Sequence, residues 1–575
     1  MIPVFKPLEV PKRSYLPQDF TITTWEALAP YAQQLIDFQF TTMDFFSQWL
    51  SHLSELEAVI SEDACWRQIK MTCNTQDPSL EEAYTYFVME IEPPLKPLAF
   101  ELQKKLDQSP FKNELDTAIY FPYLRGVANA IALYKEENIA IQADINVLAQ
   151  QYGATASKMT IHFQEKEYTL QQAAKFLQSS DADIRKEVFE LISSRRLEDQ
   201  KVLNDLFNQL ITKRNQIALN AGFENYRDYK FKELGRFDYS VKDCFEFHEA
   251  VKEYIVPIQK KLLQHKKSLL QIQGPLRPWD TSATPKGQKA LSPFTDGKDL
   301  AAKAIQVFEK LNPYFSSCIA SMQSMGRLDL DSRKGKAPGG YNCPLAETGV
   351  PFIFMNAAGT HGDVITMMHE GGHAFHSFLS HPLSLSAFKE YPMEIAELAS
   401  MSMELFSLEH WDVFYENKEE LKRAQLEELE RIINVLPWIA TIDSFQHWLY
   451  TNPSHTEEER TQAWIATLDK FSTQEVDWSG LESIRAASWQ KQLHLFEVPF
   501  YYIEYGIAQL GALAMWRQYK QNKEQALSNY CNALSLGYTK SLKELYQIAG
   551  IQFDFSPAYI KELAAFVTAA IEEML

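Results

Sequence analysis

The chain has 575 residues, of which 46% are hydrophobic and 23% are charged, and its formal net charge is −19. This composition is typical of a soluble globular protein, and the length predicts several domains or one large body with several lobes. The negative charge argues against nucleic acid and anionic membranes as partners, and no apolar run is long enough to span a bilayer.

Two further features concern the cellular location. Residues 1–7 lack the basic and apolar stretches of a secretion signal, so we expect none. The six cysteines are scattered through the chain without C-x-x-C pairs: Cys65, Cys73, Cys244, Cys318, Cys343 and Cys531. This distribution is typical of reduced thiols and predicts a cytoplasmic protein.

Hydrophobic periodicity predicts a mainly α-helical fold. Long amphipathic segments with little glycine recur along the chain, for example over residues 182–196, 201–221 and 421–435. Strand patterns are confined to short pieces, of which residues 159–164 and 350–356 are the clearest. Residues 273–299 are rich in proline and glycine and predict a long irregular connection, a feature that is often functional in compact proteins.

The helical segment after the second strand contains His369-Glu370-Gly371-Gly372-His373, an H-E-x-x-H motif. Residues four apart on a helix lie on one face, one turn apart, so the two imidazoles can bind one tetrahedral zinc ion. Glu370 would lie beside that ion, where its carboxylate can accept a proton from water as a general base. Asp363 is available as the N-cap of this helix.

Gly371 and Gly372 are unusual in the middle of an apolar helix. Each glycine costs about 0.8–1 kcal/mol relative to alanine at such a position. We therefore expect another backbone, or the substrate, to approach the helix so closely that a side chain would block it.

A catalytic zinc site needs a third protein ligand besides the two histidines of the motif. The pattern H-E-x-x-H-x-x-G-x-x-H would require Gly at position 376 and His at position 379, but the chain has His376 and Leu379. The acidic residues of the following segment, 390–404, are better candidates, because their apolar neighbours predict a buried helix. The spacing alone leaves Glu394 and Glu397 open as the ligand.

Several separated stretches resemble the oligoendopeptidase F branch of the zinc metallopeptidases that also include thimet oligopeptidase and neurolysin. The motif with its flanks, residues 368–376, and the segment 397–404 carry the resemblance most strongly. Other stretches agree with the same branch: residues 276–280, 334–341, 351–356 and 499–506. The resemblance is strong from about residue 200 to the last residue, whereas the first 200 residues match only in general character.

The resemblance implies a metal site and a general base. It makes His369, His373 and Glu397 the ligands of one zinc ion per chain, and Glu370 the base. Zinc would polarise the scissile carbonyl and lower the pKa of the attacking water.

The resemblance also implies residues around the metal. His494, Tyr502 and Tyr505 match a histidine and tyrosines that the family places opposite the ion, where they would stabilise the oxyanion of the reaction. Glu404 and His376 match positions from which the ligating imidazoles would be oriented. Without the resemblance, the aromatic residues near position 500 would be interpreted as core residues of a helix.

The implied fold consists of two helical lobes around a deep central channel, with a small β-sheet beside the zinc helix. We expect an N-terminal helical lobe over residues 1–195 and a catalytic domain over residues 196–575. The edge of the strand at 350–356 could bind an extended peptide by strand addition. The predicted function is zinc-dependent hydrolysis of internal bonds in short peptides.

Two alternatives remain at this point. One is a metallocarboxypeptidase with the same zinc helix but a binding site for the end of a chain. The other is a non-catalytic, peptide-binding helical protein whose zinc is structural, although structural sites are usually closed by four protein ligands.

Overall fold

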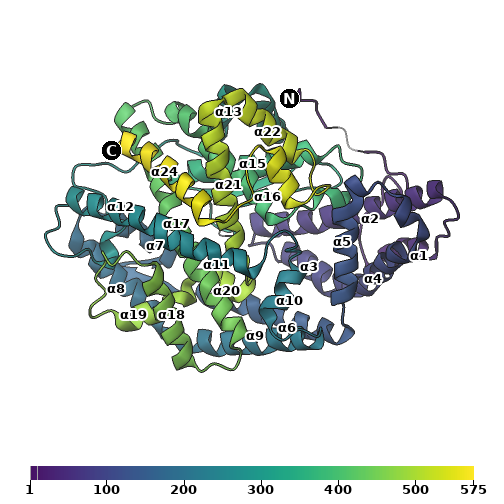
Figure 1. The fold of residues 1–575 in the computed structure, drawn as a ribbon, viewed down its shortest axis with the longest axis horizontal. Helices are drawn as coiled ribbons and strands as arrows, with labels where there is room; N and C mark the ends of the chain where they lie inside the picture. The colour runs from purple at the N-terminus through teal and green to yellow at the C-terminus, as the bar shows by residue number, and fades with distance from the viewer. Residues whose placement is uncertain (1, 9–10, 338) are drawn as a thin grey trace. The chain divides into compact units, whose positions relative to one another are not determined.

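The computed structural model describes residues 2–8, 11–337 and 339–575, so Pro338, part of one motif above, lies outside the described residues. The chain is mainly helical, as predicted (Figure 1). It divides into two compact units. Unit 1 contains the described residues of Met1–Ala132, Leu291–Gln425 and Ala508–Phe553, and unit 2 contains Leu133–Ala290, Leu426–Ile507 and Asp554–Leu575. The expected domain boundary after residue 195 falls within unit 2 and remains a prediction, as do the two lobes and the channel.

Unit 1 contains one set of helices and a three-stranded sheet. Its elements are α1 (Trp25–Asp37), α2 (Met43–Cys73), α3 (Pro78–Tyr86), α4 (Glu92–Gln108), α5 (Thr117–Leu133, whose last residue belongs to unit 2), α13 (Gly297–Leu311), α14 (Pro313–Ser324), β3 (Leu328–Asp331), β4 (Tyr341–Cys343), β5 (Phe352–Ala357), α15 (His361–Ser380), α16 (Met393–Ser407), α22 (Lys523–Leu534) and α23 (Leu542–Ile548).

Unit 2 contains the other helices and a two-stranded hairpin. Its elements are α6 (Glu136–Ala156), β1 (Thr160–Phe163), β2 (Lys166–Thr169), α7 (Leu170–Ala174), α8 (Ala182–Glu198), α9 (Gln200–Asn220), α10 (Tyr226–Glu233), α11 (Val241–Ala250), α12 (Val256–Leu269), α18 (Glu457–Phe471), α19 (Glu482–Ala487), α20 (Leu493–Glu497) and α24 (Pro557–Met574). Two helices, α17 (Lys418–Thr451) and α21 (Tyr502–Gln521), have residues in both units.

The periodicity located the elements well. The helices expected at 182–196, 201–221 and 421–435 form α8, α9 and part of α17, and the two expected strands form β1 and β5. The connection expected at 273–299 is irregular apart from a 3-10 turn at Pro278–Asp280 and the first turn of α13. None of the described helices is both long enough and apolar enough to cross a membrane.

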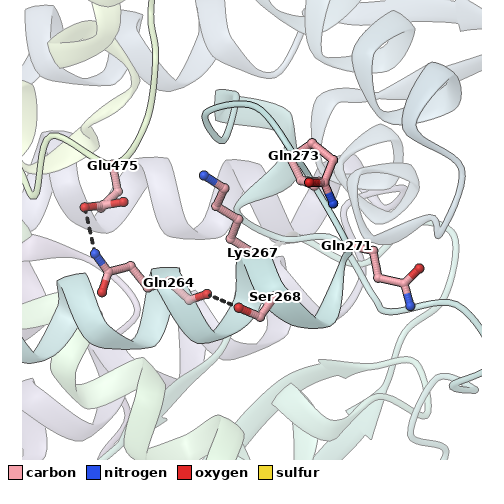
Figure 2. A pocket seen from close by; sticks show the side chains of 7 residues that line it. Gln264, Lys267, Ser268, Gln271, Gln273 and Glu475 are labelled. Atoms are coloured by element: carbon pink, nitrogen blue, oxygen red, sulfur yellow. Dashed lines mark hydrogen bonds between the residues drawn. The ribbon is translucent and has the colours of Figure 1, made fainter.

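A polar pocket of unit 2 lies where α12 leads into this connection. Figure 2 shows its lining, in which the Gln264 side chain donates to Oε1 of Glu475 at 3.1 Å and the Ser268 hydroxyl donates to the Gln264 carbonyl. Its lining contains none of the candidate catalytic or metal-binding residues.

The sheet of unit 1 has the strand order β3-β5-β4. β5 pairs in parallel with β3, where Leu328 faces Ile353, and antiparallel with β4, where Asn342 faces the same Ile353. Both edges of β5 are therefore occupied by neighbouring strands. The expectation that an edge of the strand at 350–356 binds the substrate is wrong, because the outer strands are β3 and β4.

Candidate metal centre and active site

Helix α15 carries the H-E-x-x-H motif within one continuous helix, His361–Ser380. Its N-cap is Thr360, whose hydroxyl and backbone N–H pair with Asp363 in a capping box. Asp363 is thus the third residue of the helix and not the expected N-cap. The helix continues through both glycines, so His369 and His373 lie on one face, with ring centroids 4.9 Å apart.

The glycines of the motif permit the close packing of α15 that the sequence predicted. A Cβ atom at Gly372 would lie 2.5 Å from Cα of Ser400 and 2.6 Å from the carbonyl oxygen of Ala399, both in the backbone of α16. At Gly371 it would lie 2.6 Å from the ring of Phe308 on α13. The absence of a side chain at Gly372 therefore lets the backbone of α16 pack directly against the motif.

This packing brings Glu397 of α16 to the two imidazoles. Its Oε2 atom lies 3.4 Å from Nε2 of His369 and 3.8 Å from Nε2 of His373, and all three donor atoms lie within 4.8 Å of one another. Two ligands bonded to one tetrahedral zinc ion at about 2.0–2.1 Å are about 3.3 Å apart. The three donors fit such an ion. Of the two open candidates, Glu397 belongs to this group and Glu394 does not.

Glu404, seven residues after Glu397 on α16, orients the imidazole of the candidate ligand His369. Its Oε1 atom lies 2.6 Å from Nδ1 of His369, and its side chain is buried. Because a carboxylate can only accept, the proton of the neutral ring is on Nδ1 and the lone pair of Nε2 is available to a metal. Burial alone would lower the pKa of His369, but this hydrogen bond and the charges of Glu397, Glu404 and Glu370 raise it to about 9. The site therefore favours a positive charge at this imidazole, and a bound metal ion would supply that charge in place of the proton on Nε2.

We expect Glu404→Gln to weaken metal binding by about 10–100-fold, the usual effect of losing a group that orients a ligand. The amide keeps a hydrogen-bond acceptor but removes the negative charge beside His369. Metal affinity is measured by competition with a chromophoric chelator. Glu420→Gln, an exposed residue of α17, is the control and should bind metal like the unmodified chain. Equal affinities of the two variants would show that Glu404 does not support the ligand.

Glu370 combines burial with an unsatisfied carboxylate. The residue is 6% exposed, and its Oε2 atom has no hydrogen-bond partner. Burial raises the pKa of Glu370 to about 7. Its backbone carbonyl accepts a hydrogen bond from the Asn342 side chain at 3.2 Å, which fixes β4 beside α15. A carboxylate with a pKa near neutral pH can both accept and return a proton.

His376 does not orient the ligands in the way that the sequence suggested. Its ring stacks on Tyr391 with a centroid separation of 3.4 Å, and neither ring nitrogen has a hydrogen-bond partner. Burial lowers its pKa to about 3, so the ring is neutral. His376 is a packing residue beneath the motif.

The other predicted residues form an aromatic cluster in unit 2. The His494 ring centroid lies 4.8 Å from that of Tyr502 and 6.0 Å from that of Tyr505. Tyr501, which the sequence analysis did not assign, packs edge-on against Tyr505 at 5.0 Å. All four side chains are partly exposed, whereas neighbouring Phe500 is fully buried, so this is not an ordinary core cluster.

A hydrogen-bond chain fixes the tautomer of His494. Indole nitrogens only donate, so Nε1 of Trp438 donates to Oε1 of Gln492 at 3.0 Å, and this sets the orientation of the Gln492 amide. The amide nitrogen then donates to Nδ1 of His494 at 2.7 Å. Burial lowers the pKa of His494 to about 4, so the ring is neutral with its proton on Nε2. His494 is therefore a hydrogen-bond donor through Nε2.

Buried hydrogen bonds hold the segment that carries the tyrosines. Phe500 has a positive φ of 67°, unusual for a residue with a side chain, and its N–H donates to Oε1 of Gln446 at 2.6 Å. Arg236 donates to the Phe500 carbonyl and, at 2.8 Å, to Oε1 of Glu504. These buried contacts fix the backbone from which Tyr502 and Tyr505 project.

Known proteins resemble the chain over most of its length. The PZ peptidase A structure with inhibitor 2 superimposes with a TM-score of 0.90 and 27% identity, covering 96% of this chain and 98% of that one. The oligoendopeptidase F homolog of Borreliella burgdorferi is 23% identical over 65% of this chain and 63% of its own length. Oligopeptidase PepF of Bacillus subtilis is 20% identical over 71% of this chain and 60% of its own length. The matches thus span less than two thirds of these two curated relatives.

Sequence profiles give the family. The profile of the peptidase M3 N-terminal domain matches residues 17–134, and the profile of peptidase family M3 matches residues 175–565. The predicted resemblance to the oligoendopeptidase F branch is confirmed by these profiles together with the named relatives. Since the second profile alone covers more than half of the sequence, the chain belongs to peptidase family M3, a family of metallopeptidases with a metal cofactor.

Proposed function

We propose that the chain is a zinc-dependent oligoendopeptidase that hydrolyses internal bonds of short peptides. The observation that carries this proposal is the grouping of His369, His373 and Glu397 within 4.8 Å, beside the buried, unpartnered carboxylate oxygen of Glu370. Three protein ligands leave a fourth position for water or substrate, which is the arrangement of catalytic rather than structural zinc sites.

Each residue has a proposed task in the reaction. His369, His373 and Glu397 would hold the zinc ion, which when bound supplies Lewis acidity toward the scissile carbonyl and makes water more acidic. Glu370 accepts a proton from the attacking water at its Oε2 atom. It then gives this proton to the nitrogen of the departing amine, so that its own charge is restored in each turnover.

The aromatic cluster of unit 2 is proposed to stabilise the oxyanion that forms on the scissile carbonyl. Phenols of Tyr502 and Tyr505 and Nε2–H of His494 are neutral donors, suited to a negative charge that develops only during the reaction. The tautomer of His494 set by Gln492 supports this assignment.

We expect Tyr502→Phe to lower kcat about 100-fold or more with little change in KM, because a donor to a developing oxyanion acts mainly in the transition state. Steady-state kinetics on a quenched fluorescent peptide measure both constants. Tyr168→Phe, in β2 of the same unit, is the control and should retain full activity. An unchanged kcat for Tyr502→Phe would remove this residue from the proposed mechanism.

The edge strand β4 is the proposed binding surface for the peptide main chain. It ends the strand order of the sheet, and Asn342 fixes it to the backbone of Glu370. An extended peptide added to such an edge forms main-chain hydrogen bonds that do not depend on its sequence. This fits an enzyme with many short substrates.

Product mapping tests the proposed function. A library of short peptides blocked at both ends should be cut internally, and a chelator should abolish cleavage until zinc is restored. Stepwise loss of residues from unblocked C-termini, with blocked peptides left intact, would favour a metallocarboxypeptidase. Absence of any cleavage by the zinc-loaded chain would favour the non-catalytic alternative.

A further inference from the structure

A second group of metal-ligating side chains lies in the core of unit 2. Cys244 and His248 are one turn apart on α11, and Asp443 and His447 are one turn apart on α17. Each pair therefore projects from one face of its helix. The donor atoms of Cys244, Asp443 and His447 lie within 4.8 Å of one another.

The distances within this group fit ligands shared by one metal ion. Nε2 of His447 lies 3.2 Å from Oδ2 of Asp443, yet both nitrogens of the His447 ring lack a hydrogen-bond partner. Two nitrogen and oxygen ligands of one tetrahedral zinc ion are about 3.3 Å apart, without a proton between them. Oδ1 of Asp443 also has no hydrogen-bond partner.

The group is buried, and aromatic rings pack against it. Cys244 is 2% exposed, Asp443 is 0% exposed and His447 is 3% exposed. The rings of Phe245, Phe231 and Phe500 pack against the His447 ring with centroid separations of 4.8, 5.8 and 5.4 Å. Buried polar atoms without partners are rare in proteins, and a buried cation would satisfy them.

His248 provides the support that a ligating carboxylate usually has. Its Nε2 atom lies 2.8 Å from Oδ2 of Asp443 and can donate to it. With Asp443 held in this way, its two oxygens, the thiolate of Cys244 and an imidazole nitrogen of His447 make up four donor atoms. A site closed by protein donors and shielded from water is structural rather than catalytic.

We propose that Cys244, Asp443 and His447 bind a second divalent transition-metal ion of the zinc class, with His248 orienting Asp443. The sulfur donor argues against magnesium and calcium, which prefer oxygen ligands. The ion would join α11 to α17 beneath the segment that carries the tyrosines, since Phe500 contacts His447 and donates to Gln446 of the same helix. This proposal does not depend on the proposed peptidase activity.

Metal stoichiometry gives the first test. The full chain, produced in zinc-containing medium and freed of loosely bound metal, should contain two zinc ions per chain by inductively coupled plasma mass spectrometry. The double variant His369→Ala/His373→Ala should retain one ion, and Cys244→Ser should also retain one. A folded, unmodified chain with a single ion that is lost in the double variant would overturn the proposal.

Cobalt provides a readout that only the second site can give. The candidate catalytic site contains no sulfur donor, so a thiolate-to-cobalt charge-transfer band in the near ultraviolet would report Cys244 alone. The band should appear in the Co²⁺-loaded chain and in His369→Ala/His373→Ala. It should disappear in Cys244→Ser and persist in Cys531→Ser, whose cysteine is equally buried, in α22 of unit 1. If Cys244→Ser does not fold, the unmodified chain decides the question: absence of the band there would contradict the proposal.

Discussion

Glu370→Gln is expected to abolish nearly all peptide hydrolysis while leaving the metal bound. The amide has almost the same shape as the carboxylate but cannot accept a proton, and a positioned general base contributes about 10²–10⁴-fold to a reaction of this kind. The three proposed ligands are untouched, so the metal content should remain that of the unmodified chain. Measurements of kcat/KM and of metal content on the same preparation separate the two effects.

Glu420→Gln is the matched control, because it makes the same chemical change at an exposed position of α17. It should retain both full activity and full metal content. If Glu370→Gln were as active as this control, Glu370 could not be the base. If Glu370→Gln lost metal as well as activity, the loss of metal alone would explain the loss of activity.

Gly372→Ala is expected to destabilise the fold by about 1–3 kcal/mol and to weaken metal binding by about 10–100-fold. An added methyl group would lie 2.5 Å from Cα of Ser400, a backbone atom that can move only if α16 moves as a whole. Such a shift would carry Glu397 away from the two imidazoles. Thermal unfolding with and without metal, together with chelator competition, measures both quantities.

Gly362→Ala on the same helix is the control for this variant. A Cβ atom there has Thr360 Oγ1 as its nearest neighbour at 3.7 Å, an ordinary contact. Because alanine favours a helix over glycine by up to about 1 kcal/mol, this variant should be as stable as the unmodified chain or more stable. The same behaviour of Gly372→Ala would mean that close packing of α16 does not define the site.

The candidate metal ligands of α15 could be predicted because a helix has a regular local repeat. Spacing alone places His369 and His373 on one face and Glu370 beside them. The third candidate ligand could not be derived in the same way, because Glu394 and Glu397 both lie on a buried helix. The packing of α16 against Gly372 distinguishes the two glutamates, because it brings Glu397 to the imidazoles. The hydrophobic period of a helix does not show how that helix packs against another.

The incorrect predictions concern residues whose contact partners in the folded structure could not be identified from the sequence. Asp363 is an acceptor within a capping box because Thr360, three residues earlier, ends the preceding loop. The strand at 350–356 lies at the centre of its sheet because β4 pairs with one of its edges. β4 has only three residues, too few to give a recognisable strand pattern in the sequence. The ring of His376 stacks on Tyr391, a partner that no spacing rule could indicate.

The candidate metal-binding group of Cys244, Asp443 and His447 could not be predicted from the sequence for a related reason. A cysteine and a histidine one turn apart, or an aspartate and a histidine one turn apart, are each too common to indicate a metal. Only the packing of α11 with α17 brings Cys244, Asp443 and His447 together. The signal that could have found them is the occurrence of two such pairs on helices whose other faces are apolar.

Anomalous diffraction at the zinc absorption edge tests the central claim most directly, because it locates the ion without assumptions about its ligands. We predict a peak about 2.0–2.2 Å from Nε2 of His369, Nε2 of His373 and a carboxylate oxygen of Glu397. A zinc-loaded crystal without a peak at these three side chains, or with Glu397 beyond bonding distance of the ion, would contradict the account.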